Sequence, residues 1–498
     1  MQTILLLSLV CISCVHHVQG ALQLASVFSS HMVLQRAPHS AVIWGTADTE
    51  GDKVTAQVIA ANTSIAPVVA TVSHGAWKLR LPPVAARGPF TINVTSNEGQ
   101  VILTDVLFGD VWLCSGQSNM YFTMNQVMNN TAELLTAHNF PNIRFTRARL
   151  VESATPRSSM TFDIPWTGPA NTRGLQGISA VCWLFAEYLY PHINHPIGLI
   201  ESSWGGTPIE AWSPPDAIHD CAAVTKRAPG NNTVLWNAMI NPLLGTTLFG
   251  ALWYQGEANA GRAAKYSCQI KAMVSRWRSH FRDSSLNQTD ATFPFGYVQL
   301  AGNAPGDSVG GFPGERWAQT AGYGYSPNPA LPKTFMAVAM DLPDYKSPFG
   351  TVHPRFKQDV AQRLLLGALN VAYGHSDVVF QGPFPSKFQL NAAQHTLTIE
   401  YDSGRTPLEI RNNTGFEVCC SAPNATECSD TRDHWVAAPI THHDASHVTV
   451  TTSGCTTSKA TGLRYEWRTS PCDYKNCAVY GAESGLPAPP YITHTIPL

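Results

Sequence analysis

The chain has 498 residues, of which 44% are hydrophobic and 13% are charged, and its formal net charge is −2. This composition excludes a disordered chain, and the length allows two or three domains with a large core. A charge so close to neutral gives no electrostatic reason to expect a nucleic acid as partner.

Residues 1–20 are typical of a signal peptide. The apolar run over residues 4–12 has the length of a signal-peptide core, and small residues precede Ala21 as they do at a cleavage site. The run is too short to cross a bilayer, and no later segment predicts a membrane span. We therefore expect a secreted or luminal protein.

Sequons and cysteines agree with this compartment. Asn-X-Ser/Thr sequons occur at Asn62, Asn93, Asn129, Asn231, Asn287, Asn412 and Asn424. Disulfides are expected among the last six cysteines, which are Cys419, Cys420, Cys428, Cys455, Cys472 and Cys477. A metal site is the weaker interpretation, because no CxxC pair accompanies the adjacent Cys419 and Cys420. Cys114 and Cys182 lie in apolar strand and helix patterns, which makes them candidates for free core thiols.

Residues 21–105 predict a β-sandwich-like domain. β-branched or alternating runs over 40–44, 54–58 and 90–94 are separated by turn residues at the spacing of a sandwich. No cluster of acids, bases or metal ligands stands out in this part of the sequence. A structural or carbohydrate-contacting module is the favoured interpretation.

From residue 106 to residue 375 the pattern predicts strands that alternate with helices. Buried strands are expected over 106–113, 197–201, 248–254, 295–300 and 335–340. Helical patterns fall over 124–135, 178–190, 266–281 and 360–369. This α/β alternation favours a parallel sheet with helices on both faces, and such sheets bind ligands at the carboxyl ends of their strands.

Residues 376–498 return to β patterns and predict a second, disulfide-containing β domain. The runs over 397–401 and 447–451 alternate between apolar and polar side chains, and the last six cysteines all fall in this part of the chain.

The first strand of the α/β region ends in a turn that suits a nucleophile. Ser115-Gly116 can form a tight turn because glycine accepts unusual backbone angles, and Ser118 follows directly. A serine between a strand and a helix is exposed above the end of the sheet. The plainer alternative is that Ser118 only caps the following helix.

Polar motifs also follow three other expected strands. Paired glycines, Gly205 and Gly206, let backbone N–H groups approach a ligand closely. The side-chain amide of Gln255 can donate to a developing oxyanion. His353 follows the last strand and stands before a proline, on a loop above the same sheet edge as Ser118. Each motif alone has a bland explanation as a turn or a loop, but the joint arrangement is more specific.

Together these motifs resemble the sialate O-acetylesterase family of the SGNH hydrolase superfamily. The resemblance rests on Gly116-Gln117-Ser118-Asn119-Met120, on the segment from Trp204 to Trp212, on Trp253-Tyr254-Gln255-Gly256-Glu257 and on His353-Pro354-Arg355. It extends over essentially the whole mature chain. It implies a flavodoxin-like SGNH core and an esterase that removes O-acetyl groups from sialic acids, chiefly at the 9-position, in secreted or lysosomal forms and without a metal or organic cofactor.

The resemblance also implies roles for individual residues. Ser118 matches the nucleophile and His353 the base. The Ser118 amide, the Gly206 amide and the Gln255 side chain are the expected oxyanion donors, with Asn259 as a weaker candidate. The substrate carboxylate implies an arginine near the site, and the unranked candidates are Arg144, Arg173, Arg262 and Arg316.

The third member of a triad is missing at its usual place. The superfamily often has an aspartate three residues before the catalytic histidine, where this chain has Gly350. Asp341 and Asp344 are the nearest acidic candidates. The alternative, which we favour, is a Ser–His dyad in which a backbone carbonyl close to Gly350 or Thr351 accepts the second ring N–H.

Two other functions remain open from the sequence. One is a carbohydrate-binding protein without catalysis, which covalent labelling of Ser118 by an organophosphate would exclude. The other is an acetylxylan-type deacetylase, which a comparison of acetylated sialic acid with acetylated xylan would distinguish.

Overall fold

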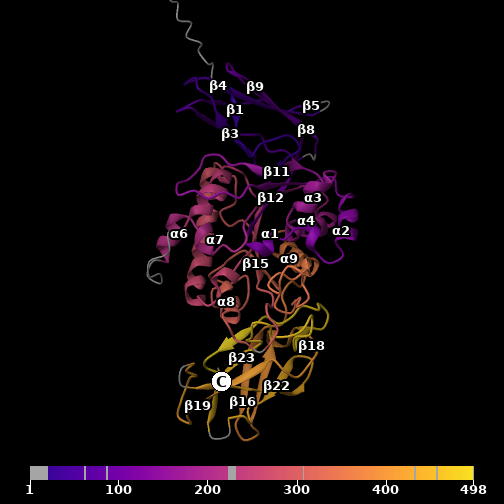
Figure 1. Ribbon diagram of the computed structural model, residues 1–498, viewed down its shortest axis with the longest axis vertical. Helices are drawn as coiled ribbons and strands as arrows, with labels where there is room; N and C mark the ends of the chain where they lie inside the picture. Colours follow the sequence, from indigo (N-terminus) through magenta and orange to yellow (C-terminus); the bar gives the residue numbers. More distant parts are fainter. Residues whose placement is uncertain are drawn as a thin grey trace, which may run out of the picture.

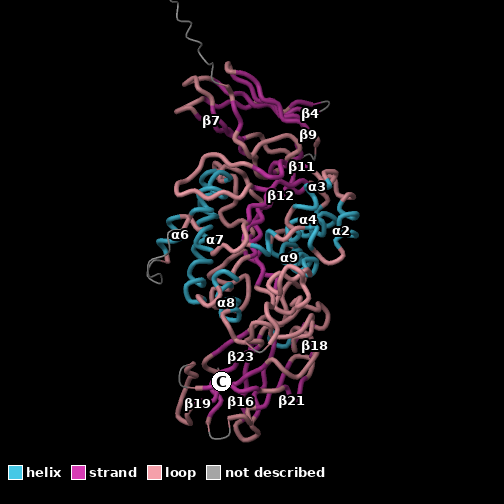
Figure 2. The backbone as a smooth tube through the Cα atoms, in the orientation of Figure 1, coloured by secondary structure: helices cyan, strands magenta, loops and turns pink. Residues whose placement is uncertain are grey.

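The computed structural model describes residues 21–60, 63–85, 88–221, 232–306, 308–430, 433–455 and 458–496. The expected signal peptide and the sequons at Asn62 and Asn231 lie outside these residues. The chain forms an elongated stack, in which a helix-containing middle part separates β structure at the two ends (Figures 1 and 2). Among the described residues, no helix is both long enough and apolar enough to cross a membrane.

The N-terminal end is built from short strands, as expected, which pair antiparallel except for β2, which lies parallel to the later strand β9 Gly99–Gly116. They are β1 Gln23–Leu24, β2 Val33–Gln35, β3 Val42–Thr46, β4 Lys53–Ala60, β5 Thr63–Ser64, β6 Val68–Thr71, β7 Ala76–Arg80 and β8 Phe90–Ser96. Strands β1, β3 and β7 form one sheet, and β4 pairs with β5, β6 and β8. Alternate residues of β4 and β8 are buried, which matches their period-two sequence pattern.

One long strand joins this β structure to the middle of the molecule. Strand β9, Gly99–Gly116, pairs antiparallel with β8 through its first half and parallel with two strands of the central sheet through its second half. Its residues are all buried from Val106 onward. The domain boundary expected after residue 105 therefore falls inside a continuous strand.

The central sheet contains all five strands that were expected in the α/β region. Besides β9 they are β12 Ile197–Ser203, β13 Gly250–Tyr254, β14 Phe295–Gln299 and β15 Thr334–Val338. They lie parallel in the order β12-β9-β13-β14-β15, and counted among themselves along the chain these five strands have the flavodoxin-like order 2-1-3-4-5. Two strands of the sheet were not expected: β10 Ile143–Ala148, which extends the sheet in parallel beside β12, and β11 Phe162–Thr167, an antiparallel edge strand.

Helices cover both faces of this sheet, with α7 on one side and α4 and α9 on the other (Figure 1). The α-helices are α1 Ser118–Tyr121, α2 Asn130–Ala137, α3 Thr172–Gly177, α4 Ala180–Ile193, α5 Ile209–Trp212, α6 Pro215–Asp220, α7 Ala263–Ser284, α8 Phe312–Gln319 and α9 Lys357–Val371. Shorter helical turns are η1 Met124–Gln126, η3 Trp236–Ile240, η4 Asn241–Leu243, η5 Glu257–Asn259 and η6 Asp402–Gly404. The single helix expected over 124–135 is wrong, because η1 ends at Gln126 and α2 begins only at Asn130, after a left-handed Asn129.

The C-terminal part is β-rich, as expected. Its strands are β16 Pro385–Asn391, β17 Thr396–Tyr401, β18 Leu408–Ile410, β19 Phe416–Ser421, β20 His434–Ala437, β21 Ile440–His443, β22 His447–Thr451, β23 Lys459–Tyr465, β24 Val479–Gly481 and β25 Tyr491–Thr493. Two four-stranded sheets, β16-β17-β22-β21 and β20-β19-β23-β25, account for most of them.

The last six cysteines are paired, as predicted, in the disulfides Cys419–Cys428, Cys420–Cys455 and Cys472–Cys477. A fourth disulfide joins Cys221 to Cys268. The expectation of free thiols at Cys114 and Cys182 is wrong, because these two cysteines form a fifth. Cys114 lies on β9 and Cys182 in the first turn of α4, which packs across the sheet, so their α-carbons lie 6.0 Å apart.

Candidate active site

Ser118 lies where the sequence predicted, directly after the carboxyl end of β9. Gly116 has a φ of +138°, and a β-carbon there would lie 2.2 Å from the carbonyl oxygen of Tyr254 on β13, so the turn requires glycine. Ser118 is the first residue of α1, and its N–H therefore has no acceptor within the helix. The flavodoxin-like order places this turn at the switch point between β9 and β13, where such sheets bind ligands.

His353 reaches Ser118 from the loop after β15. Its Nε2 lies 2.8 Å from Ser118 Oγ, and its Nδ1 lies 2.8 Å from the carbonyl oxygen of Phe349. A carbonyl can only accept, so Nδ1 carries the proton and Nε2 is free to accept the proton of the serine hydroxyl. The Phe122 ring stacks on the imidazole at a centroid distance of 6.5 Å. This pair can carry out acyl transfer.

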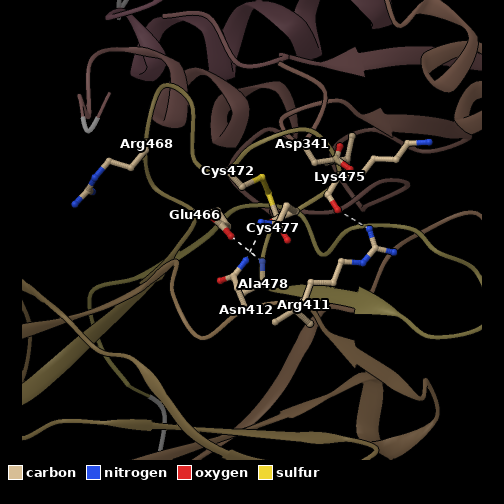
Figure 3. The surroundings of a disulfide bond; sticks show 12 residues. Asp341, Arg411, Asn412, Glu466, Arg468, Cys472, Lys475, Cys477 and Ala478 are labelled. Atoms are coloured by element: carbon tan, nitrogen blue, oxygen red, sulfur yellow. Dashed lines mark hydrogen bonds between the residues drawn. A yellow bond between two sulfur atoms is a disulfide. The ribbon is translucent and has the colours of Figure 1, made fainter. Parts of the chain in front are cut away.

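Asp341 is held away from the imidazole by a buried ion pair. Its carboxylate accepts two hydrogen bonds from Arg363 at 2.6 and 2.9 Å and a third from the Tyr480 hydroxyl at 3.0 Å. Its carbonyl accepts the N–H of Lys475, which lies between the cysteines of the Cys472–Cys477 disulfide (Figure 3). Asp341 thus ties the end of β15 to the C-terminal part.

Asp344 also pairs with an arginine. Its carboxylate accepts two hydrogen bonds from the Arg355 guanidinium, at 2.6 and 3.1 Å. Burial alone would raise the pKa of Asp344, but the hydrogen bonds and charge of Arg355 outweigh this and lower it. Because Arg355 stands two residues after His353, this ion pair closes the base of the His353 loop.

Of the two glycines, it is Gly205 that lies against the serine. A β-carbon on Gly205 would lie 3.3 Å from the β-carbon of Ser118, whereas one on Gly206 would meet nothing within 4 Å. The N–H of the preceding residue, Trp204, donates to the carbonyl of Gly116 and fixes the segment beside the turn.

Gln255 is buried beneath the turn instead of opening onto it. Its Nε2 lies 2.8 Å from Asn259 Oδ1 and 3.2 Å from both Gln117 Oε1 and the carbonyl of Thr207. The Asn259 amide in turn donates to Glu210 at 2.8 Å. Both amides therefore donate to partners within the protein, and the oxyanion role expected for Gln255, or for Asn259, stays a prediction.

A second buried network, which was not expected, lies around Asn119. The Asn119 Nδ2 donates to Glu257 at 2.6 Å and to the carbonyl of Val352 at 2.9 Å, while Lys357 Nζ donates to its Oδ1 at 2.6 Å. Burial lowers the pKa of Lys357 to about 7 and raises that of Glu257. Asn119, the residue after Ser118, is thus hydrogen-bonded to Val352, the residue before His353. In the sequence, this network was indicated only by the position of Asn119 within the motif Gly116–Met120.

Comparisons with known proteins identify the family of the chain. The family model described as "Carbohydrate esterase, sialic acid-specific acetylesterase" matches residues 108–309, and the one described as "Sialate O-acetylesterase C-terminal domain" matches residues 386–495. The mouse sialate O-acetylesterase is 40% identical, over 94% of this chain and 93% of its own, and the human one is 41% identical, over 94% and 92%. The chain belongs to the sialate O-acetylesterase family.

A solved structure supports the same assignment over nearly the whole chain. A carbohydrate acetylesterase from Xanthomonas citri is 29% identical, with a TM-score of 0.78 over 95% of this chain and 99% of its own. As a member of this family of carbohydrate esterases, the protein is an esterase.

Two of the arginine candidates for this family's acidic substrate are engaged elsewhere. Arg144 pairs with Asp105 at 2.8 Å, at the opposite end of β10 from the site. Arg316 is fully buried and donates to the carbonyls of Leu300, Ala301, Arg468 and Thr469. Arg262 is exposed and donates to the carbonyl of Ala258 at 2.7 Å. Arg173 is exposed on α3 and lines a cavity.

The asparagines of the described sequons differ in their exposure to solvent. Asn129, Asn287 and Asn424 are exposed, whereas Asn93 and Asn412 are half-buried. The Asn412 side chain also donates to the carbonyl of Asn476 and accepts from Thr414. We expect glycans first at the three exposed asparagines.

Proposed function

We propose that this esterase hydrolyses O-acetyl esters of sialic acids, mainly at the 9-position, through an acyl-enzyme on Ser118. The observation that carries the proposal is the 2.8 Å contact between His353 Nε2 and Ser118 Oγ, with the imidazole oriented by a carbonyl on its other side. Family membership supports the sialic acid substrate, and the resemblance stated from the sequence supports the 9-position.

The reaction proceeds in two steps. His353 Nε2 takes the hydroxyl proton as Ser118 Oγ attacks the acetyl carbonyl, and it then gives that proton to the departing sugar oxygen. In the second step His353 takes a proton from water, the hydroxide attacks the acyl-serine, and the proton returns to Oγ as acetate leaves. No metal or organic cofactor enters either step.

The oxyanion is held by backbone amides. The Ser118 N–H has no helical acceptor, and the second donor is the N–H of Gly205 or Gly206, with Gly205 favoured because it lies against the serine. Each donor of this kind contributes roughly 3–4 kcal/mol to lowering the barrier. Gln255 acts indirectly, by fixing Gln117 next to the nucleophile.

A dyad is sufficient for this chemistry. The Phe349 carbonyl fixes the tautomer of His353, which is one of the two tasks of the aspartate in a triad, and stabilises the imidazolium less than a carboxylate would. Asp341 and Asp344 support the site from outside, through their arginines.

The proposal is tested by a substrate panel. Acetate release is measured from 9-O-acetyl sialic acid, 4-O-acetyl sialic acid and acetylated xylan. We expect the highest kcat/KM on the 9-O-acetyl compound and stoichiometric labelling of Ser118 by an organophosphate. A preference for xylan would show an acetylxylan-type deacetylase, and labelling elsewhere would remove Ser118 from the mechanism.

We further propose that the protein acts in a secretory or lysosomal compartment. Five disulfides support this, since disulfides persist in oxidising surroundings. Peptide mapping of the secreted protein without reduction should recover all five, and free thiols at these positions would contradict the proposal.

A further inference from the structure

A cavity of about 580 Å³ lies beside α3 at the end of the sheet that carries Ser118. Its lining includes Arg147, Asp163, Asn171, Arg173, Gly174 and Gly177. Figure 1 shows α3 next to β11, on the side of the sheet covered by α4. Two of the lining residues are arginines, so the cavity suits a ligand with a negative charge.

Arg147 comes from β10 and has unused hydrogen-bonding capacity. Its Nη1 donates to the carbonyl of Gly177 at 2.6 Å, and among the described residues this is the only hydrogen bond of a guanidinium with five N–H groups. Its Nε is buried without an acceptor. A ligand in the cavity can therefore supply acceptors to the remaining N–H groups on Nη1 and Nη2, for which no acceptor within the described residues is seen.

The site of Arg147 is within reach of Ser118. β10 lies two strands from β9 across β12, and neighbouring strands are about 4.8 Å apart, which separates the two backbones by roughly 10 Å. The Arg147 guanidinium stands 5.3 Å from the ring of Tyr121, one helical turn after Ser118 on α1. One sugar molecule can therefore extend over Tyr121 from the arginine to the serine.

We infer that Arg147, assisted by Arg173, binds the carboxylate of the sialic acid while its O-acetyl ester lies at Ser118. The planar guanidinium matches a carboxylate with two parallel hydrogen bonds. The inference rests on the proposed function, and it favours an ester at the end of the glycerol side chain, which is the part of the sugar that reaches farthest from the carboxylate.

The other charges around the cavity are compatible with this role. Glu201 faces Arg147 from β12, and its carboxyl accepts the N–H of Ser179 and the Ser203 hydroxyl. Burial raises the pKa of Glu201 to about 7, so in mildly acidic medium it is protonated and leaves the positive charge of Arg147 unopposed. Asp163 is exposed at the rim, where it can accept hydrogen bonds from sugar hydroxyls.

The test compares 9-O-acetyl-N-acetylneuraminic acid with its C1 methyl ester, which has no charge. For each enzyme, kcat/KM on the free acid is divided by kcat/KM on the methyl ester, so a general loss of activity cancels. We expect a ratio of about 10 to 100 for the wild type, as for a hydrogen-bonded charge pair, and a ratio within about threefold of 1 for Arg147→Gln. Arg147→Lys keeps the charge but loses the planar fork, so its ratio should be intermediate, and Arg173→Gln should lower the ratio less.

Arg262→Gln is the matched control. It removes an exposed arginine that follows β13, the strand on the other side of β9 from β12 and β10. It should keep the wild-type ratio. The inference is overturned if Arg147→Gln keeps that ratio, if Arg262→Gln abolishes it, or if the wild type cleaves both sialate esters equally well. An enzyme that cleaves acetylated xylan and neither sialate ester would overturn the proposed function, and the inference with it.

Discussion

The proposed dyad lies at the same end of the sheet as Asp341 and Asp344, the two aspartates that precede His353 in the chain. The hydrogen-bond partners differ, because one is neutral and the others are charged. His353 is half-buried and bonds to a neutral carbonyl, whereas Asp341 and Asp344 each have an arginine as a bidentate partner. The difference teaches that carboxylates close to an active site in sequence need not act on its histidine. Here they hold the strand end and the loop that position it.

The largest effect should come from the dyad. Ser118→Ala and His353→Ala should each lower kcat by at least about 10³-fold without changing the unfolding temperature, because both side chains are half-buried and lie on loop or turn positions. The double variant should be little worse than either single one, since the two residues act as a unit. Strictly additive losses in kcat would show independent roles.

Asp341→Asn should have the opposite effect to the dyad variants, because it should lower stability and leave turnover nearly unchanged. It leaves the buried Arg363 without a counter-charge, which costs about 3–5 kcal/mol in the free energy of unfolding. We expect kcat within about tenfold of the wild type, a barrier change under about 1.4 kcal/mol. Denaturant unfolding and steady-state kinetics measure the two quantities. A folded variant that lost three decades of kcat would make Asp341 the third member of a triad.

Asp344→Asn should have a smaller effect, and one that depends on pH. The folded-state pKa of Asp344 lies below its usual value, so its ion pair stabilises the protein above about pH 4 and this contribution is lost as the pH falls through the folded-state value. We expect a loss of about 1–2 kcal/mol at pH 7, since Arg355 is partly exposed, and convergence with the wild type as the pH falls through the folded-state pKa. A difference that did not shrink at any pH in an acid titration of both folded proteins would rule out the ion pair as its cause.

Gly350→Asp should have the smallest effect on turnover, although it restores an acid at the superfamily's usual position. Gly350 has a φ of +90°, so a side chain there costs about 1–2 kcal/mol, and the Nδ1 proton already has an acceptor in Phe349. We expect kcat within about threefold of the wild type. A gain of tenfold or more would mean that the dyad lacks, and can use, a carboxylate.

The sequence predicted those features that depend on local pattern. The five apolar runs of the central sheet, the turn at Ser118 and the position of His353 were all visible in it. Strands β10 and β11 were missed because their polar residues, including Arg147 and Asp163, interrupt the apolar pattern. The dyad itself was favoured from the absence of an acid at Gly350, and Phe349 lies one residue before the carbonyls that were named.

Other features depend on contacts between distant segments and had no local sign. Cys114 and Cys182 are 68 residues apart, and only the packing of α4 on β9 brings them together. Gln255 has an amide suited to an oxyanion, but the neighbouring strands bury it against Gln117 and Asn259. The partners of Asn119 come from η5, from the loop that carries His353 and from the start of α9.

The continuity of β9 limits how the protein can be cut or fused. A fragment that starts at residue 106 would lack β2 and β8, which both pair with β9. Val106 and Phe108, which are almost fully buried in the whole protein, would then be exposed to water. The same fragment would lose the first half of the strand that ends in the Ser118 turn. Engineers who need a minimal esterase should therefore keep the N-terminal strands, and place tags or fusion partners between the expected signal peptide and Ala21 or on an exposed loop.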